Sequence, residues 1–123
     1  MKSKILIIDD DQVIPEMYRM KFEQGGFDVD VVASGKKALE KIKEYEPDAV
    51  LLDIAMYPVD GFSVMEEING AKLKKIPKII ILSNVGQKEE VEKGKKLGAA
   101  DYIVKSNIIP SEVVERVKNL LNK

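Results

Sequence analysis

Short apolar runs alternate along this chain with longer segments in which apolar residues recur every three or four positions. The short runs predict strands, and the longer segments predict amphipathic helices. The first run, 4–8, is continuous enough for a strand that is buried on both faces. Strands are predicted at 4–8, 27–32, 49–52, 79–82 and 102–104. Helices are predicted at 12–24, 35–45, 61–70, 87–97 and 110–121.

Capping and turn residues mark the ends of these helices. Asp10 or Asp11 is expected to cap the first helix, and Gly25 with Gly26 to end it. Ser34 is expected to cap the second helix. The apolar residues expected along the helix faces are Val13, Met17, Met20, Ala38, Leu39, Ile42, Phe62, Met65, Ile68, Val113, Val117, Leu120 and Leu121.

The order of the elements is a strand followed by a helix, five times over. This alternation predicts an α/β fold in which a parallel sheet carries helices on both faces, with right-handed crossovers. Five such units in about 120 residues fit the doubly wound, flavodoxin-like strand order 2-1-3-4-5. The strand at 27–32 alternates in polarity, which places it nearer the sheet edge. We expect a single domain over residues 1–123.

The composition of the chain excludes several partners and catalytic mechanisms. The 123 residues carry a net charge of -1, which argues against nucleic acid as a direct partner. The chain has no Cys and no His, so thiolate and Ser-His catalysis are excluded and any metal must be held by oxygen, as Mg²⁺, Ca²⁺ or Mn²⁺ are. No signal peptide or membrane-spanning pattern is present. We therefore expect a cytoplasmic protein that does not bind membranes.

Polar residues follow four of the five predicted strands. The first strand ends at Asp9-Asp10-Asp11, the third at Asp53, the fourth at Ser83 and the fifth at Lys105. Each residue alone has an ordinary explanation, such as a helix cap, a turn or a solvated lysine. Parallel sheets bind ligands beyond the carboxyl ends of their strands, at the switch point in strand order. We therefore expect these side chains to form one site.

Charge repulsion indicates what this site binds. Two carboxylates about 4 Å apart repel by about 4 kcal/mol at an effective dielectric near 20, so Asp9, Asp10 and Asp53 need a cation between them. Lys105 supplies one positive charge, and Mg²⁺ supplies the rest through oxygen ligands. Asp53 can then act as a nucleophile towards a phosphoryl group. Ser83 and Lys105 can hold the phosphoryl oxygens.

On these residues the sequence resembles the receiver (CheY-like) domain of two-component response regulators, over essentially its whole length. The matching segments are Ile5-Leu-Ile-Ile-Asp-Asp-Asp11, Asp53-Ile-Ala-Met with Asp60-Gly61, Ile80-Ile-Leu-Ser83, and Gly98-Ala-Ala-Asp-Tyr-Ile-Val-Lys105. The resemblance implies a phospho-acceptor switch that catalyses its own phosphorylation and dephosphorylation and is not otherwise an enzyme. Its implied partners are a sensor histidine kinase or phosphotransfer protein, which supplies the phosphoryl group, and an unidentified downstream protein.

The resemblance also implies residue roles. Asp53 is the phospho-acceptor, and Asp10 and Asp53 are direct Mg²⁺ ligands, with Mn²⁺ as an alternative metal. Asp9 acts through water, and the backbone carbonyl of Ala55 completes the protein ligands. Ser83 and Lys105 contact the phosphoryl group, and Ser83 with Tyr102 forms the switch. The implied output face comprises the fourth helix, the fifth strand and the fifth helix.

The sequence departs from the family pattern at several positions. The usual Pro four residues after the acceptor is replaced by Tyr57, with Pro58 following, and the usual Pro after the lysine is replaced by Ser106. Asn84 stands where a smaller residue is common. Ala55 and Val85, which in the family flank the path of attacking water, cannot hydrogen-bond it. This predicts a long-lived acyl phosphate.

Three other functions fit parts of the sequence. A haloacid-dehalogenase-like, Mg²⁺-dependent phosphatase would use Asp9 and Asp11, but it needs a later acidic pair and leaves Asp53 unexplained. A flavin- or nucleotide-binding module would need phosphate-binding donors after the first strand, where this chain is acidic. A receiver-like module that works without phosphorylation is disfavoured because all acceptor-site residue types are present.

Overall fold

The structure is a computed structural model that describes residues 2–84 and 86–122. Its strands are β1 (Lys4–Ile8), β2 (Asp28–Val32), β3 (Ala49–Leu52), β4 (Lys78–Ser83) and β5 (Asp101–Val104). Its helices are α1 (Ile14–Gln24), α2 (Ala38–Tyr45), α3 (Gly61–Gly70), α4 (Lys88–Lys96) and α5 (Pro110–Leu121), with a short 3-10 turn at Lys105–Asn107. All the strands and helices expected from the hydrophobic pattern are confirmed, with bounds that shift by three residues or fewer.

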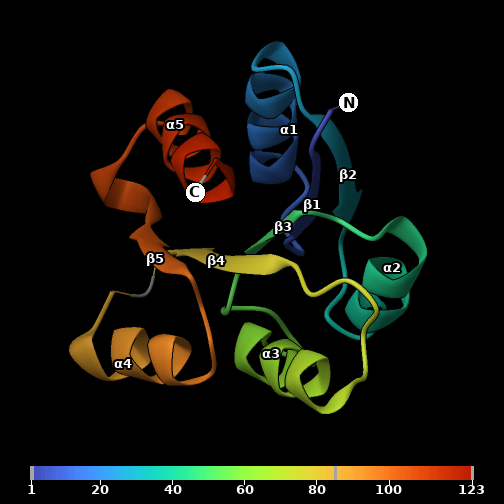
Figure 1. Cartoon of the computed structure of the whole chain (residues 1–123). Coiled ribbons are helices and arrows are strands. Elements are labelled where there is room, and N and C mark those ends of the chain that lie inside the picture. The colour runs from blue at the N-terminus through green and yellow to red at the C-terminus, as the bar shows by residue number, and fades with distance from the viewer. Residues whose placement is uncertain (1, 85, 123) are drawn as a thin grey trace.

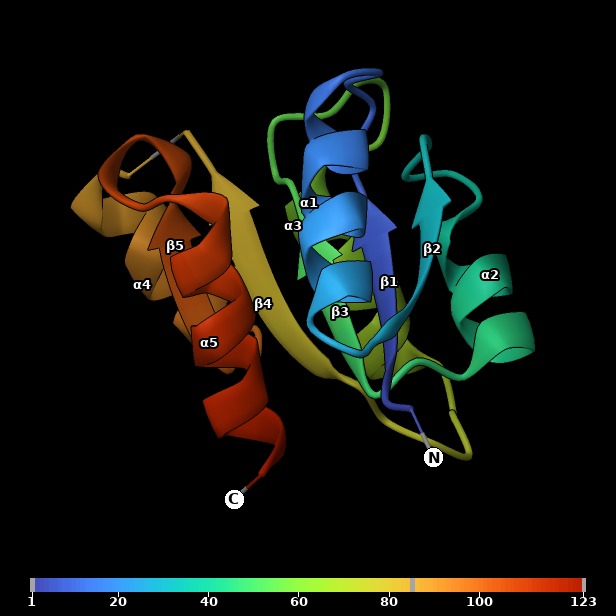
Figure 2. The ribbon, with the colours of Figure 1, turned by 90° about the horizontal axis from the view of Figure 1, so that it is seen from above.

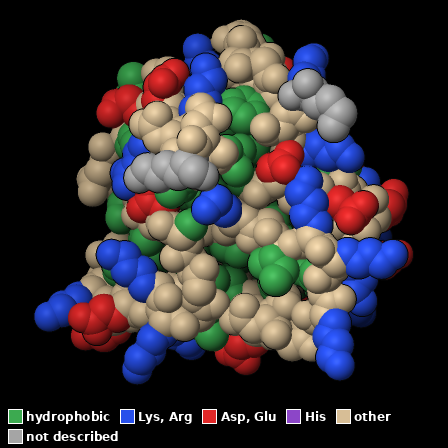
Figure 3. All heavy atoms as spheres, in the orientation of Figure 1, with side chains coloured by type: hydrophobic (Ala, Val, Ile, Leu, Met, Phe, Trp, Pro, Cys, Tyr) green, Lys and Arg blue, Asp and Glu red, His purple; other side chains and the backbone are tan. Residues whose placement is uncertain are grey.

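The strands form one parallel sheet in the order β2-β1-β3-β4-β5, which confirms the predicted fold. Helices α1 and α5 cover one face of the sheet, and α2, α3 and α4 cover the other (Figures 1 and 2). The alternating strand β2 lies at the sheet edge, as its sequence predicts. Figure 3 shows acidic and basic side chains interspersed over the visible face of the molecule.

Alternate residues of the central strands point to opposite helix layers. In β1, Ile5 and Ile7 pack with α1 and α5, whereas Leu6 and Ile8 pack with α2 and α3. All four side chains are at most 2% exposed. A strand covered on both faces needs apolar residues at every position, and this is why β1 is a continuous apolar run.

The face that α1 buries differs from the predicted one. Val13, Met17 and Met20 are 69%, 51% and 58% exposed, so the expected apolar face points away from the core. The helix buries Tyr18 and Phe22 against the sheet instead. Aromatic side chains bury 150–250 Å² each, more than Met or Val, so the rotation that buries the two rings stabilises the fold most.

The starts of two helices settle one open alternative and correct one prediction. The Asp11 Oδ1 atom accepts hydrogen bonds from the backbone N–H groups of Val13 (2.8 Å) and Ile14 (3.0 Å), so Asp11 rather than Asp10 caps α1. Ser34 Oγ accepts from the N–H of Lys36 at 3.2 Å, in a turn that precedes α2 rather than at its cap. In α5, Val114 joins the predicted inward residues, and Leu120 and Leu121 are only partly buried.

None of the helices in the described residues combines the length and the hydropathy that a membrane span requires.

Candidate functional site at the carboxyl edge of the sheet

The polar strand-end residues meet at the carboxyl edge, the edge of the sheet where its parallel strands end. Backbone hydrogen bonds continue past the strands here: the N–H of Asp9 donates to Val32 O (3.1 Å), and that of Asp53 donates to Ile8 O (3.0 Å). These bonds fix Asp9 and Asp53 next to each other, one after each of the adjacent strands β1 and β3. The switch point between these strands, inferred from the strand order, is therefore where the carboxylates lie.

The acidic residues form a compact cluster. One carboxylate oxygen from each of Asp9, Asp10 and Asp53 lies within 4.8 Å of the others. Asp9 is 4% exposed and Asp53 is 9% exposed, whereas Asp10 is exposed. Three carboxylates at this separation, two of them dehydrated, have the oxygen-rich chemistry that fits a divalent cation such as Mg²⁺.

Lys105 lies between the two buried carboxylates. Its Nζ atom is 3.0 Å from Asp9 Oδ2 and 4.0 Å from Asp53 Oδ2, and its side chain is only 10% exposed. The 3-10 turn that begins at Lys105, directly after β5, brings this ammonium across from the far side of the sheet. One cation for three carboxylates leaves the cluster with an excess of negative charge.

The environment of Asp53 raises the pKa of its carboxyl group above the ordinary value. Burial raises the pKa of the Asp53 carboxyl most strongly, and the Asp9 charge raises it further. The Ala55 N–H, which donates to Asp53 Oδ1 at 3.1 Å, lowers this pKa, as do the Lys105 charge and a hydrogen bond with Ser83. The net pKa stays above the ordinary carboxyl value, because the buried group has lost its water.

A glycine allows the loop after Asp53 to lie close to the end of β3. A side-chain Cβ at Gly61 would lie 2.6 Å from the backbone oxygen of Asp53 and 2.7 Å from Ile54 Cα. The Gly61 N–H donates to Ile54 O at 3.2 Å, and Asp60 caps α3 through Ser63. Helix α3 can therefore begin directly against Asp53 and forms one wall of the site.

The remaining predicted residues lie around this centre. Ser83 is fully buried at the end of β4, and Asn84 is exposed. The side chain of Ala55 is exposed beside Asp53, and Val85 lies outside the described residues. In the loops that depart from the family pattern, the Tyr57–Pro58 peptide bond is cis and the Lys105–Ser106 bond is trans.

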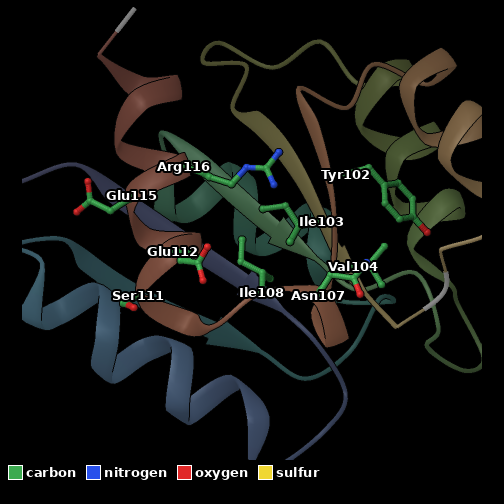
Figure 4. Close-up of a pocket in the computed structure, with 9 residues that line it drawn as sticks. All are labelled: Tyr102, Ile103, Val104, Asn107, Ile108, Ser111, Glu112, Glu115 and Arg116. Carbon is green, nitrogen blue, oxygen red and sulfur yellow. The ribbon is translucent and has the colours of Figure 1, made fainter.

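Tyr102 lies on β5 and faces the α4 side of the sheet. It packs against the apolar cluster on that side and is partly buried. Burial raises the pKa of its hydroxyl, and the charges of Glu90 and Asp53 raise it further. Figure 4 shows its ring directed away from Ile108, Glu112 and Arg116, which line a groove of about 630 Å³ between β5 and α5.

Some features of the site region were not found from the sequence. The sequence pattern predicts a buried face at Val13, Met17 and Met20, which the structure exposes, because periodicity alone does not say which of two apolar faces is buried. Glu90 on α4 lies close to Tyr102 on β5. The sequence does not predict this, because the packing of α4 against β5 is decided only in three dimensions. The spacing of Glu90 and Gly94, one helical turn apart, was the only signal available.

Comparison with known proteins identifies the family. The family model for the response regulator receiver domain matches residues 5–118, so this chain belongs to the receiver domains of two-component response regulators. Receiver domains are phospho-accepting switches rather than ordinary enzymes, and they bind Mg²⁺ through acidic residues.

Individual relatives agree with this assignment. The alkaline phosphatase synthesis transcriptional regulatory protein PhoP of Bacillus subtilis (strain 168) is 34% identical over 100% of this chain and 50% of its own length. The chemotaxis protein CheY of Thermotoga maritima is 36% identical and covers 98% of both chains. A putative response regulator from Chloroflexus aurantiacus has a solved structure with a TM-score of 0.89, 32% identity and full coverage of both chains. The chain spans about half the length of PhoP and of several other curated relatives.

Family membership removes the phosphatase alternative. That alternative needs Asp11 to aim its carboxylate at a substrate, yet Asp11 is exposed and its side chain caps α1. The buried acidic residue opposite Asp9 is Asp53, which the phosphatase mechanism leaves without a role.

Proposed function

We propose that this chain accepts a phosphoryl group on Asp53 in a Mg²⁺-dependent step and transmits the change to a downstream protein. The observation that carries the proposal is the position of Asp53, a buried carboxylate with Asp9 and Asp10 oxygens within 4.8 Å and the Lys105 ammonium 4.0 Å away. The residues also support one receiver domain over 1–123. Its place in the cytoplasm rests on family membership.

The chemistry assigned to Asp53 is nucleophilic. A carboxylate oxygen of Asp53 attacks the phosphorus of a phosphohistidine, an O–P bond forms, and the P–N bond breaks with its electron pair going to the leaving imidazole. Mg²⁺, when bound, neutralises charge on the phosphoryl oxygens. Lys105, already 10% exposed and dehydrated, holds one phosphoryl oxygen by charge, and the Ser83 hydroxyl donates to another. Water later cleaves the same O–P bond.

The metal ligands follow from the same cluster. Asp10 and Asp53 are proposed to bind Mg²⁺ directly and Asp9 through a water molecule, with the backbone carbonyl of Ala55 as a further ligand. Mn²⁺ is an alternative because it takes the same oxygen ligands. The exposure of Asp10 leaves one side of the cluster open, as a metal that keeps several waters requires.

The phosphoryl donor is proposed to be a sensor histidine kinase or phosphotransfer protein that docks across α1. Val13, Met17 and Met20 form an exposed apolar stripe at helical spacing. This stripe begins beside Asp11, next to the acidic cluster, so a helix packed on it brings a donor histidine to the acceptor edge. A charge near zero and interspersed surface charges support docking to a protein rather than to nucleic acid or a membrane.

The output surface is proposed to comprise α4, β5 and α5. The groove between β5 and α5 lies on this surface, and an ion pair of 2.7 Å between Arg116 and Asp101 joins its two sides. Tyr102 connects this surface to the acceptor site, together with Ser83 as the switch residue. The downstream protein is defined here only as one that contacts this face.

Intact-mass measurement after incubation with acetyl phosphate and Mg²⁺ tests the acceptor assignment. Wild type is expected to gain the mass of one phosphoryl group, and Asp53→Asn to gain none. Asp11→Asn is the matched control, because Asn keeps the α1 cap while one neighbouring carboxylate is removed; it is expected to behave as wild type. Labelling of Asp53→Asn, or loss of labelling in Asp11→Asn, contradicts the proposal.

A further inference from the structure

The strand β2 forms one edge of the sheet and has a neighbour on one side only. Among the strands of the described residues, β2 pairs with β1 alone, and its other side faces outward next to α2 (Figure 2). A groove of about 470 Å³ lies here, between residues 31–34 and helix α2. An edge strand presents unpaired backbone N–H and C=O groups to which another strand can bind.

The backbone groups that face this open edge belong to Val29 and Val31. The N–H of Asp28 donates to Ser3 O, just before β1, at 3.0 Å. At the other end of the strand, Val32 O accepts from the N–H of the residue that follows β1, at 3.1 Å. Residues 28 and 32 therefore turn their backbone groups towards β1. Because successive residues of a strand alternate in direction, those of Val29 and Val31 point away from it.

One of these outward N–H groups is already occupied by a side chain. The N–H of Val31 donates to Oδ1 of the neighbouring Asp30 at 2.8 Å. The other carboxylate oxygen of Asp30, Oδ2, pairs with Lys41 Nζ of α2, also at 2.8 Å. The side chains of Asp30 and Lys41 are 36% and 27% exposed, so water screens this ion pair only in part. Helix α2 thus holds the carboxylate against the edge of the sheet.

Asp30 is charged in this position at neutral pH. Burial raises the pKa of its carboxyl group, but the hydrogen bonds from Lys41 and from the Val31 N–H outweigh burial, and the pKa lies below its ordinary value. An incoming strand would bring a backbone carbonyl oxygen to the Val31 N–H. The carboxylate already accepts from that N–H, and its charge repels the carbonyl oxygen. Asp30 therefore opposes strand pairing in two ways.

The opposite edge of the sheet carries the same arrangement. In β5, the N–H of Tyr102 donates to Asp101 Oδ1 at 2.8 Å, and Asp101 Oδ2 pairs with Arg116 Nη2 of α5 at 2.7 Å. Tyr102 shares a sheet face with Ile79 of β4, whose backbone oxygen turns towards β5 and accepts from the N–H of Ala100 at 2.7 Å. Residues on one face of parallel strands turn their backbone groups the same way, so those of Tyr102 point away from β4. Both outer edges therefore have an aspartate bound to an outward N–H and to a helix cation.

The charges along the β2 groove are arranged so that they complement a second copy. The helix side of the groove presents, in chain order, Lys37, Glu40, Lys41 and Glu44. A second copy that is related by a two-fold axis runs in the reverse order, so each lysine meets a glutamate. Lys41 can take part only when Asp30 releases it. This complementarity favours a second copy over an unrelated strand as the partner for this edge.

We propose that the outer edge of β2 is a pairing surface for β2 of a second copy of this chain, and that Asp30, positioned by Lys41, keeps it closed. In the pair, the Val31 N–H of each copy would donate to Val29 O of the other, in antiparallel order. That is the N–H group to which Asp30 is bound. The inference does not depend on phosphorylation of Asp53.

Sedimentation velocity over a range of concentrations tests the closure, on unphosphorylated protein in EDTA. Asp30→Ala is expected to self-associate at least about tenfold more tightly than wild type, because the Val31 N–H and Lys41 are released. Asp30→Asn is expected to associate more weakly than Asp30→Ala, since its amide oxygen still accepts from the Val31 N–H. Glu66→Ala, which removes a negative charge on α3, is the control and is expected to behave as wild type. Equal association of wild type and Asp30→Ala, or of Asp30→Ala and Asp30→Asn, overturns the proposal.

Hydrogen exchange of single amides locates the contact. In dilute Asp30→Ala, the Val31 amide is expected to exchange at least about tenfold faster than in wild type, and to slow again together with Val29 as the protein associates. Association that leaves these two amides fast belongs to another surface and refutes pairing through β2. Lys41→Met leaves the sequence of β2 intact, so it tests the clamp even if Asp30→Ala does not fold. The Val31 amide is expected to exchange at least about twofold faster in Lys41→Met, and an unchanged rate contradicts the positioning role of Lys41.

Discussion

Replacing Asp10 by Asn removes one of the three carboxylates that crowd the carboxyl edge. Asp10 is the exposed member of the cluster, so its substitution leaves the buried packing of Asp9 and Asp53 intact. Asn keeps the shape and an oxygen ligand but not the charge. We expect Asp10→Asn to be more stable than wild type in EDTA and to lose most of the stabilisation that Mg²⁺ provides.

The size of the effect follows from the separation of the carboxylates. The facing carboxylate oxygens lie within 4.8 Å of one another, and at that distance two unit charges repel by about 0.9 kcal/mol in water and about 3.5 kcal/mol at an effective dielectric of 20. The exposure of Asp10 places its interactions near the lower figure, and Lys105 offsets part of the charge on Asp9. We therefore expect a gain of about 1 kcal/mol, which raises the Tm by about 3–5 °C.

Thermal unfolding at pH 8 with EDTA and then with Mg²⁺ measures both the stability gained by removing the carboxylate and the stabilisation by Mg²⁺. At about ten times its Kd, Mg²⁺ is expected to stabilise wild type by about 1.4 kcal/mol, and Asp10→Asn by much less. Glu67→Gln, on the exposed surface of α3, controls for the general effect of removing a negative charge. Equal Tm values for wild type and Asp10→Asn in EDTA would refute the repulsion between carboxylates. If Mg²⁺ raises the Tm of Asp10→Asn as much as that of wild type, Asp10 is not a metal ligand.

Two further predictions concern dephosphorylation and pH. Ala55→Asn supplies a side chain that can hydrogen-bond water beside Asp53, so autodephosphorylation followed by intact mass is expected to accelerate about threefold to tenfold; an unchanged rate contradicts this. Burial raises the pKa of Asp48, but the Lys75 ion pair (2.7 Å) and the Lys4 N–H outweigh it and leave the pKa below 3.8. Asp48→Asn is therefore expected to cost about 0.5–1 kcal/mol at pH 6. That difference shrinks as pH falls below 3.8 through the lowered pKa, and urea unfolding that shows a constant difference at all pH values contradicts the assignment.

The sequence alone was sufficient for the order of elements and for the composition of the acidic site. Strand burial is a local property, because a strand covered on both faces must be apolar at every position, as 4–8 is. Once the strands are known to be parallel, their carboxyl ends must share one edge. Asp9, Asp53 and Lys105 were therefore expected to meet, although 44 and 52 residues separate them along the chain (53 − 9 and 105 − 53).

The tertiary structure alone decided which apolar face each helix buries and which contacts join the helices to the sheet. In α1, two apolar faces compete, and the larger area of Tyr18 and Phe22 leaves Met17 exposed. The proximity of Glu90 to Tyr102 depends on how far α4 stands from β5, a distance that no periodicity records. Periodicity is set by the backbone of each segment alone. Which face a helix buries and how far it stands from the sheet are set by the side chains of several segments that compete for the same space.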